Sequence, residues 1–218
     1  MQDVPGTQGY ANAIPRFVEA TSIIPFEVLH HEFLEFLPAE AALVLDLGAG
    51  SGRDADTLSQ IGYRVIAVEP LAEFRALGQE LYPSSNIEWM NDALPTLQKL
   101  KYYSRQVDFI LCSGVWHHLD PEEQQAAMKR VAELVKPRGI FCLSLRHGPA
   151  GVGHHVFPID LSQTRRSADE AGFDILRETD HQPSLLANKP TVHWSRLVLQ
   201  RRGLHIIFGG KRNQSRAH

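Results

Sequence analysis

The sequence has few of the residues that mark secreted, membrane-bound or disulfide-stabilised proteins. Among 218 residues there are only two cysteines, Cys112 and Cys142, and each lies inside an apolar run. We therefore expect two buried free thiols in a protein of the reducing cytoplasm. No apolar run approaches the roughly 20 residues that span a bilayer. The first residues, MQDVPGTQGYANAIPRF, lack the basic start and apolar core of a signal peptide.

An excess of charge of either sign is also missing. The formal net charge is -3 at pH 7, which gives no general attraction to nucleic acid or to an anionic membrane. Basic residues do gather near the C-terminus, where we interpret them as a solvated end rather than a nucleic-acid-binding arm. With 43% hydrophobic residues, the chain can bury one sizeable core, and it shows no internal repeat or second domain.

One stretch organises the rest of the chain, residues 43–54, with the sequence LVLDLGAGSGRD. The short apolar run at its start favours a strand buried on both faces. Gly48, Gly50 and Gly52 follow, and residues 53–60 can begin a helix. Glycines in such a strand–turn–helix unit admit positive φ and let a ligand approach the backbone. The start of the helix presents unpaired N–H groups to that ligand.

Two ligand classes use such a turn. The dinucleotide fingerprint G-x-G-x-x-G/A needs a small residue at position 53, where this sequence has Arg53. A nicotinamide-dependent oxidoreductase is therefore disfavoured. The spacing of Asp46, Gly48, Gly50 and Gly52 instead resembles motif I of the class I S-adenosylmethionine-dependent methyltransferases.

Further pieces that resemble this family follow in the expected order. Residues 64–69 read as a second strand ending in an acid, and residues 86–91 as a third strand followed by Asp92-Ala93. Residues 107–112 read as a fourth strand, and the SGVWHHL after it resembles motif IV. The run VAELVKPRGIFCLSL resembles the family's helix, turn and fifth strand.

The resemblance implies an α/β fold, a doubly wound, Rossmann-like sheet of seven mostly parallel strands with helices on both faces. Residues 173–178 and 194–200 would form its closing antiparallel pair. We divide the chain into an N-terminal cap segment (1–38), the methyltransferase domain (39–202) and a basic, disordered-looking C-terminal end (203–218). The cap includes an amphipathic helix over residues 26–37, which either covers the substrate pocket or only closes the sheet.

The resemblance also implies a set of cofactor contacts. Glu69 would accept hydrogen bonds from ribose hydroxyls, with a solvated strand-end charge as the alternative. Asp92 would hold the adenine amino group, unless it is only a turn or N-cap acid. Asp46 would orient the turn or meet the methionine amine through water. The full set is Asp46, Gly48, Ala49, Gly50, Gly52, Glu69, Pro70, Asp92, Ala93 and Ser113.

The acceptor side rests on residues after the fourth and fifth strands. His117 and His118 are candidate general bases, or else packed residues of the family run. The candidate substrate contacts are Trp116, Arg146 and His147. Arg146 is a candidate because a guanidinium binds an anionic group well. Histidines also gather in the glycine-rich loop 147–158, but no carboxylate or cysteine completes a recognised ligand spacing, so we expect no metal.

These features predict an S-adenosylmethionine-dependent transfer of a methyl group to an O or N nucleophile, with a small molecule as acceptor. The alternatives are an RNA or protein methyltransferase and a catalytically silent methyltransferase-like binding domain. Neither the Asn/Asp-Pro-Pro-aromatic run nor the Pro-Cys pair of nucleic-acid methyltransferases occurs. The intact glycine turn and Glu69 argue against a silent domain. We expect no nucleic-acid or membrane partner.

Overall fold

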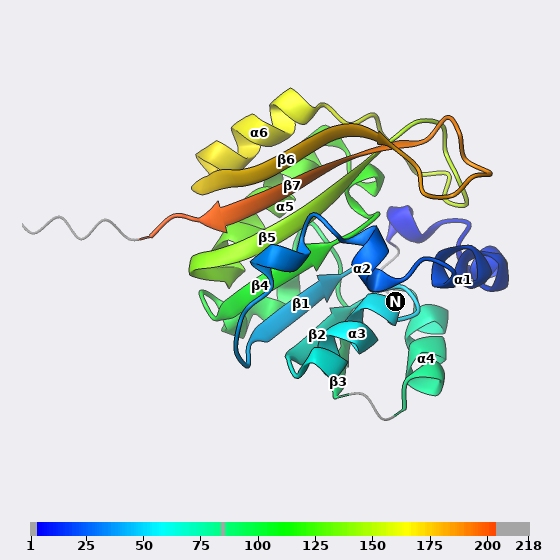
Figure 1. The fold of residues 1–218 in the computed structure, drawn as a ribbon, viewed down its shortest axis with the longest axis horizontal. Helices are drawn as coiled ribbons and strands as arrows, with labels where there is room; N and C mark the ends of the chain where they lie inside the picture. Colours follow the sequence, from blue (N-terminus) through cyan, green and yellow to red (C-terminus); the bar gives the residue numbers. More distant parts are fainter. Residues whose placement is uncertain (1–3, 84–85, 204–218) are drawn as a thin grey trace, which may run out of the picture.

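The protein forms one seven-stranded sheet with the order β3-β2-β1-β4-β5-β7-β6 (Figure 1). The computed structural model describes residues 4–83 and 86–203. Strands β1 to β5 pair in parallel, and β7 runs antiparallel to both β5 and β6. This confirms the expected α/β fold. The strands are β1 Leu43–Leu47, β2 Arg64–Val68, β3 Ile87–Met90, β4 Val107–Cys112, β5 Val135–His147, β6 Phe173–Pro183 and β7 His193–Arg201.

Helices cover both faces of the sheet. The α-helices are α1 Ile14–Ser22, α2 Phe26–Leu29, α3 Arg53–Ile61, α4 Ala72–Leu81, α5 Pro121–Leu134 and α6 Leu161–Glu170. Short 3-10 helices are η1 Pro5–Thr7, η2 Ala11–Ala13, η3 Leu34–Phe36, η4 Gln98–Tyr103 and η5 Trp116–His118. Within the described ranges, no helix has the length and apolarity needed to cross a membrane.

Alternating strand residues build two hydrophobic clusters, one on each face of the sheet. Leu45 and Ile110 belong to the cluster that residues of α5 and α6 cover. Val44 and Phe109 belong to the other, together with residues of α3 and the α2 region. The central strands are therefore buried on both faces, as the apolar run at the start of the 43–54 stretch predicts.

The predicted helix over residues 26–37 is wrong in its length. Helix α2 ends at Leu29, and His30 leaves helical geometry with φ -112° and ψ 23°. The ring of His30 is fully buried and its Nε2 lies 2.8 Å from the Asp54 carboxylate. This contact, together with stacking on Phe33 at 5.7 Å, replaces the helical continuation that the apolar spacing indicates. Most of the predicted basic tail, residues 204–218, lies outside the described residues.

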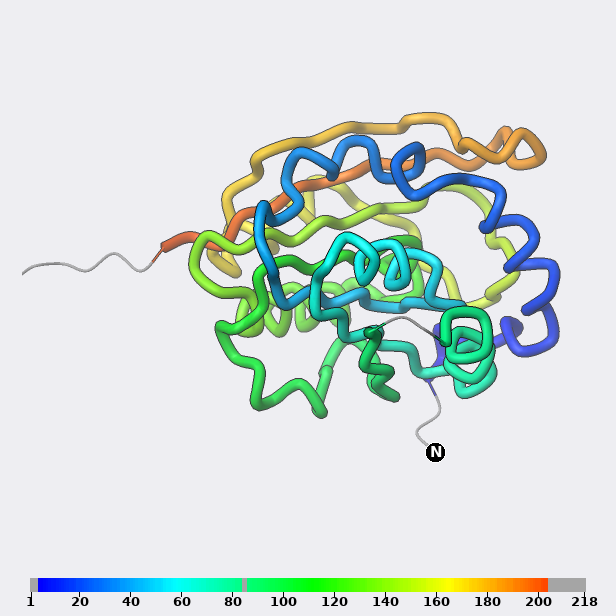
Figure 2. Tube along the Cα trace, turned by 60° about the horizontal axis from the view of Figure 1, so that its bottom comes forward, coloured from blue at the N-terminus to red at the C-terminus, as the bar shows by residue number. Residues whose placement is uncertain are grey.

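The N-terminal segment lies against the carboxyl ends of the strands. Helix α1 stands beside the loops that join β5 to α6 and β6 to β7 (Figures 1 and 2). These three segments lie far apart in the sequence, yet all of them contribute walls to one cavity. The fold thus places the N-terminal segment and these two loops at the carboxyl ends of the strands, where the strand order reverses between β1 and β4.

Candidate active site

A cavity of about 310 Å³ opens at the carboxyl ends of β1, β2, β4 and β5. Ligands of open α/β sheets bind at this end, where the strand order reverses, and here the reversal falls between β1 and β4. One half of the cavity is lined by the turn after β1 and by Glu69, Pro70, Asp92 and Ala93. The other half is lined by the N-terminal segment and by Arg146, Lys189 and Trp194.

Hydrogen bonds to the end of β2 fix the turn after β1. The N–H groups of Gly48 and Ala49 donate to the carbonyl of Val68 at 2.8 and 3.1 Å. Gly50 has φ +55°, and a Cβ built there would meet only the Phe17 ring at 3.7 Å. The backbone at Gly50 is therefore open to the cavity, and a ligand can approach it closely.

Gly52 packs the start of α3 against β3. It does not line the cavity. It forms the N-cap of α3 with φ +87°, and a Cβ there would lie 2.7 Å from the Trp89 ring. Helix–strand packing thus requires glycine at this position, and a cofactor contact of Gly52 stays a prediction.

Glu69 is a fixed, buried carboxylate. It is 5% exposed, and its two oxygens accept the N–H groups of Gly50 at 2.9 Å and Leu71 at 2.8 Å. Burial raises the pKa of Glu69, although these two hydrogen bonds act in the opposite direction. The alternative of a solvated strand-end charge is therefore wrong. The carboxylate lines the cavity beside the open backbone of Gly50.

Asp92 has the structural role that was its alternative. Its carboxylate accepts N–H groups from Ala93, Gln98 and Lys99 at 2.9, 3.2 and 2.7 Å. These bonds fold the segment after β3 and start η4. Asp92 and Ala93 still line the cavity, so a contact with a bound ligand stays a prediction.

Asp46 lies behind the turn rather than in the cavity. It is 3% exposed, accepts a bond from the backbone of Ala55, and leaves its Oδ2 without a partner in the described chain. Burial first, and then the nearby Asp54 carboxylate, raise the pKa of Asp46 well above its ordinary value. Of its two predicted roles, this position fits the orientation of the turn.

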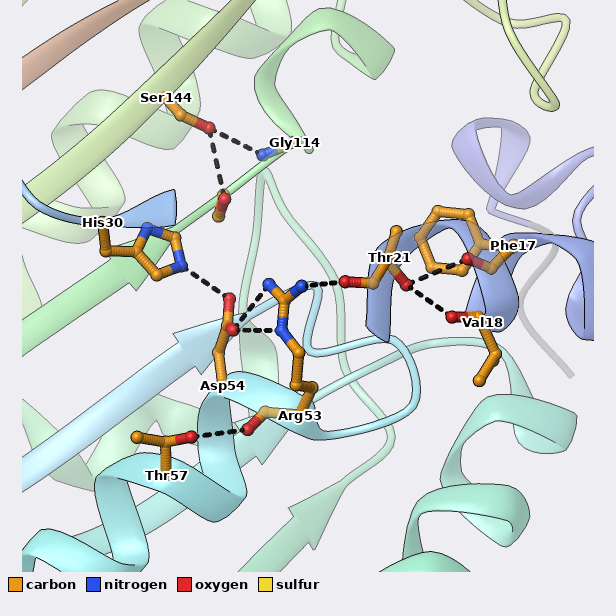
Figure 3. A network of polar contacts seen from close by, with 10 residues as sticks. Phe17, Val18, Thr21, His30, Arg53, Asp54, Thr57, Gly114 and Ser144 are labelled. Carbon is orange, nitrogen blue, oxygen red and sulfur yellow. Dashed lines mark hydrogen bonds and ion pairs between the residues drawn. The ribbon is translucent and has the colours of Figure 1, made fainter. Parts of the chain in front are cut away.

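A polar network ties the start of α3 to the N-terminal segment (Figure 3). Asp54 accepts bonds from His30 at 2.8 Å and from Arg53 Nε at 2.7 Å, and Arg53 also donates to the Thr21 carbonyl at 2.5 Å. Burial alone would raise the pKa of Asp54, but His30 and Arg53 lower it to about 2. Arg53, which disfavours a dinucleotide site, thus links the glycine turn to α1.

His118 connects three segments at the half of the cavity that Arg146 lines. Its Nδ1 lies 2.7 Å from the carbonyl of His155, which can only accept, so Nδ1 carries the proton. Its Nε2 is then a free acceptor for the O–H of Tyr10 at 3.0 Å. Burial lowers the pKa of His118, and burial also lowers that of the neighbouring His117 well below its ordinary value. Both imidazoles are therefore neutral near pH 7.

Arg146 is a buried cation with little compensation. It is 8% exposed, and within the described part of the chain it donates one long hydrogen bond, 3.4 Å, to the Gly148 carbonyl. The nearby Arg196, by contrast, pairs with the buried carboxylate of Glu32. Lys189 also lines the cavity, and burial lowers the pKa of both Arg146 and Lys189. A buried guanidinium without a carboxylate is costly, which makes this end of the cavity favourable for an anion.

Two of the predicted substrate contacts do not reach the cavity. Trp116 is 1% exposed and packs in the core against Phe141, because η5 turns its side chain toward the sheet. His147 follows Arg146 on β5, and successive strand residues point to opposite faces. Trp194, the register partner of Arg146, lines the cavity instead. Ser113 lines the cavity, as predicted. The next residue, Gly114, donates its N–H to the Ser144 hydroxyl (Figure 3).

Tyr10, Phe17 and Trp194 line the cavity without having been predicted. The two N-terminal aromatics stand in a segment with no clear period, so nothing in the sequence orients them. Trp194 could have been predicted from the sequence, because the pairing of β7 with β5 puts its side chain on the same face as that of Arg146.

Comparison with known proteins matches residues 44–139 to the "Methyltransferase domain" family model. Residues 44–139 are therefore similar to a methyltransferase domain. This confirms the resemblance seen in the sequence, and the matched residues run from β1 into the first part of β5. An uncharacterized methyltransferase of Mycobacterium tuberculosis is 33% identical over 103 residues, which are 47% of this chain and 39% of that protein. One of Oceanobacillus iheyensis is 30% identical over 100 residues, 44% of this chain and 43% of that protein. The chain thus spans less than half the length of these relatives.

Solved structures of methyltransferases share the whole fold. The 1,6-didemethyltoxoflavin-N1-methyltransferase of Burkholderia thailandensis matches with a TM-score of 0.66 and 19% identity, over 90% of this chain and 85% of that one. A TehB-like SAM-dependent methyltransferase of Corynebacterium glutamicum matches with a TM-score of 0.65 and 14% identity, over 88% and 97%. At such low identity the likeness concerns the fold alone.

Proposed function

We propose that the protein is an S-adenosylmethionine-dependent methyltransferase that methylates an O or N atom of a small molecule bearing an anionic group. The observation that carries this proposal is the open backbone of Gly50 beside the buried Glu69 carboxylate, at the switch point of the sheet. The family match of residues 44–139 supports the same reaction class.

The residues of the first half of the cavity fit the nucleoside and amino-acid parts of S-adenosylmethionine. Glu69 keeps lone pairs for ribose hydroxyls, and Gly50 leaves the space that a side chain would fill. The residues we assign to the cofactor are Gly48, Ala49, Gly50, Glu69, Pro70, Asp92, Ala93 and Ser113. When bound, S-adenosylmethionine supplies an electrophilic methyl group on a sulfonium. Two structural relatives, the Burkholderia enzyme and a Synechocystis magnesium protoporphyrin IX methyltransferase, contain S-adenosylhomocysteine and SAM respectively.

The second half of the cavity fits a small acceptor with a negative charge. Arg146 supplies a guanidinium fork for a carboxylate or a related anion, and Lys189 adds a second positive charge. Trp194 offers an aromatic wall in the same half. The Burkholderia relative holds 1,6-didemethyltoxoflavin, a small molecule, which supports an acceptor of this size.

Tyr10 and His118 can remove the proton that the acceptor loses. The acceptor donates to the Tyr10 oxygen while the Tyr10 proton passes to Nε2 of His118. The His155 carbonyl, which accepts the Nδ1–H of His118, stabilises the resulting imidazolium. Arg146 opposes a lasting positive charge there, so the proton then leaves to solvent. Proximity of the two bound molecules supplies the rest of the rate gain, about 7–11 kcal/mol in well-oriented systems.

Calorimetric titration with S-adenosylhomocysteine, with NADH as the comparison, tests the cofactor assignment. We expect micromolar binding of the former and none of NADH. Binding of NADH alone would overturn the proposal. S-adenosylhomocysteine binding that persists while no acceptor panel produces turnover would favour the silent-domain alternative.

A panel of small aromatic and aliphatic acids, each paired with its neutral methyl ester, tests the acceptor class by release of S-adenosylhomocysteine. We expect turnover with acids whose esters are inert. The Arg146→Met variant should lose at least tenfold in kcat/KM with the acids while binding S-adenosylhomocysteine normally. Turnover of RNA or a protein, with a steep salt dependence for RNA, would favour the alternative macromolecular acceptors.

The proposal places the protein in the cytoplasm. Cys112 and Cys142 are both buried and free, and the described residues include no disulfide. Burial raises the pKa of both thiols, which makes them inert packing residues.

A further inference from the structure

We propose that His147, Asp180 and His181, with His193 beside them, form a site for a divalent transition metal, Zn²⁺ in the first place. The ligand atoms of the first three residues all lie within 4.8 Å of one another. This cluster lies at the ends of β5, β6 and β7, and its members are absent from the lining of the active-site cavity. The site is thus separate from the proposed methyl transfer.

Strand pairing brings the histidines together. His147 of β5 is the register partner of His193 of β7, so the two side chains share one face of the sheet. Strand β6 bulges between Thr179 and Gln182, opposite the same part of β7. The bulge adds Asp180 and His181 to this corner.

Backbone strain supports a role for His181. Its φ is +48°, in the left-handed region that residues with a side chain adopt only rarely. This conformation stacks its imidazole on that of His147, with ring centroids 4.3 Å apart, and leaves the His193 ring 6.3 Å from the His181 ring. Strain of this kind persists where surrounding contacts hold it, and it is concentrated at functional sites.

The charges of the cluster suit a cation. Asp180 Oδ1 accepts the hydroxyl of Ser195 at 2.6 Å and lies 2.6 Å from His181 Nδ1. Asp180 supplies the carboxylate of the cluster, and carboxylate oxygens are metal ligands. The nearby Arg165 is paired with Glu178, so its charge is already compensated.

Two or three imidazoles and one carboxylate make a donor set typical of zinc. Ligand atoms around a tetrahedral zinc lie roughly 3.3 Å apart, because each bond is about 2.0–2.1 Å long. The ligand atoms of this cluster, all within 4.8 Å of one another, must approach by at most about 1.5 Å, and the 2.6 Å contact between Asp180 and His181 must lengthen. Ser195 is fully buried, and its hydroxyl contacts both Asp180 and His147, at 2.6 and 2.8 Å. It is placed to orient these ligands, as second partners do in metal sites.

A bound ion would also stiffen the acceptor half of the active site. Arg146 and Trp194, which line the cavity, directly neighbour His147 and His193 on the same two strands. The metal would join β5, β7 and the bulge of β6 on the opposite face. It therefore acts as a positioning group for the cavity wall, without touching the acceptor.

Titration of the untagged, metal-free chain with ZnCl₂ tests the site directly. We expect one ion per chain with a micromolar Kd, and an intense visible absorption of tetrahedral type when Co²⁺ replaces Zn²⁺. His147→Ala and Asp180→Asn should each weaken binding at least tenfold. His154→Ala is the matched control, because His154 is an exposed histidine outside the cluster, and it should bind like wild type.

The result that overturns the proposal is a wild-type Kd above about 1 mM, or equal binding by wild type and both cluster variants. Thermal unfolding of the metal-free variants shows whether they are folded, and Asp180→Asn keeps the size and hydrogen bonds of an exposed side chain. Zinc alone is the probe, so the outcome does not depend on S-adenosylmethionine or on an acceptor. Failure of the proposed methyl transfer would leave this result standing, and the reverse is also true.

Discussion

Replacement of Glu69 by glutamine should weaken S-adenosylhomocysteine binding roughly 10–150-fold. The buried carboxylate now accepts the N–H groups of Gly50 and Leu71 and, by our assignment, hydrogen bonds from ribose hydroxyls. The amide nitrogen of glutamine cannot accept any of these bonds. Hydrogen bonds to a charged group contribute about 1.5–3 kcal/mol, and each 1.4 kcal/mol changes the dissociation constant tenfold.

Isothermal titration at pH 7.5 measures the effect, with Glu73→Gln as the control. Glu73 is an exposed acid in the first turn of α4, so its replacement should leave the dissociation constant unchanged. Thermal unfolding without ligand shows how far the lost N–H contacts destabilise the folded state. We expect that cost to be about 1–3 kcal/mol, from one buried N–H left without an acceptor.

An analogue of S-adenosylhomocysteine that lacks both ribose hydroxyls separates the ribose contact from damage to the turn. Wild type should lose a similar factor with the analogue as Glu69→Gln loses with the complete ligand. Glu69→Gln should bind the complete ligand and the analogue with nearly equal affinity, because it lacks the carboxylate that contacts the ribose hydroxyls. Equal affinity of wild type and Glu69→Gln for the complete ligand would refute the ribose assignment.

Three further substitutions test other parts of the structure. Gly52→Ala should lower the free energy of unfolding by about 1–3 kcal/mol more than Gly62→Ala in chemical denaturation, because both glycines have positive φ but only a Cβ at Gly52 would collide with Trp89. The folded pKa of Asp54, about 2, lies below the unfolded value near 3.9, so the ionised carboxylate stabilises the wild-type fold above about pH 4, and this stabilisation is lost toward pH 2. Asp54→Asn should lack this stabilisation at every pH. Equilibrium unfolding at several pH values measures the difference. Tyr10→Phe should reduce kcat at least tenfold and leave S-adenosylhomocysteine affinity unchanged, and an unaltered kcat would exclude the proton path to His118.

Much of the fold could be predicted because local chemistry and burial agree there. The stretch around β1 has an apolar run suited to a buried strand and glycines suited to the turn, and both lie where the sequence puts them. Helix α2 shows the limit of this reasoning. The apolar spacing favours a longer helix, but the buried contact of His30 with Asp54 ends it early, and that partner belongs to another element.

The candidate site divides in the same way. The cofactor half comes from strand ends that follow one another along the chain, so the resemblance of these stretches to the family indicates Glu69 and Ser113 in order. The acceptor half depends on contacts between distant segments. Tyr10 contacts His118 only because the N-terminal segment lies over the carboxyl ends of the strands. His147 points away from the cavity because successive side chains of β5 point to opposite faces of the sheet. The sequence around His147 offers no carboxylate for a metal site. Asp180, which lies near His147 in the fold, belongs to the bulge of β6 far along the chain.

The two halves of the cavity have unequal freedom to change during evolution. The nucleoside half is made of strand ends and a turn whose residues also hold the sheet together, so most substitutions there damage folding. The acceptor half is made of the N-terminal segment and two long loops, joined to the rest at a few points such as Arg53 with Thr21 and Tyr10 with His118. New acceptors can therefore be acquired by exchange of these segments, provided that the joining residues are kept. Chimeric enzymes built at the same boundaries would inherit the cofactor and exchange only the acceptor.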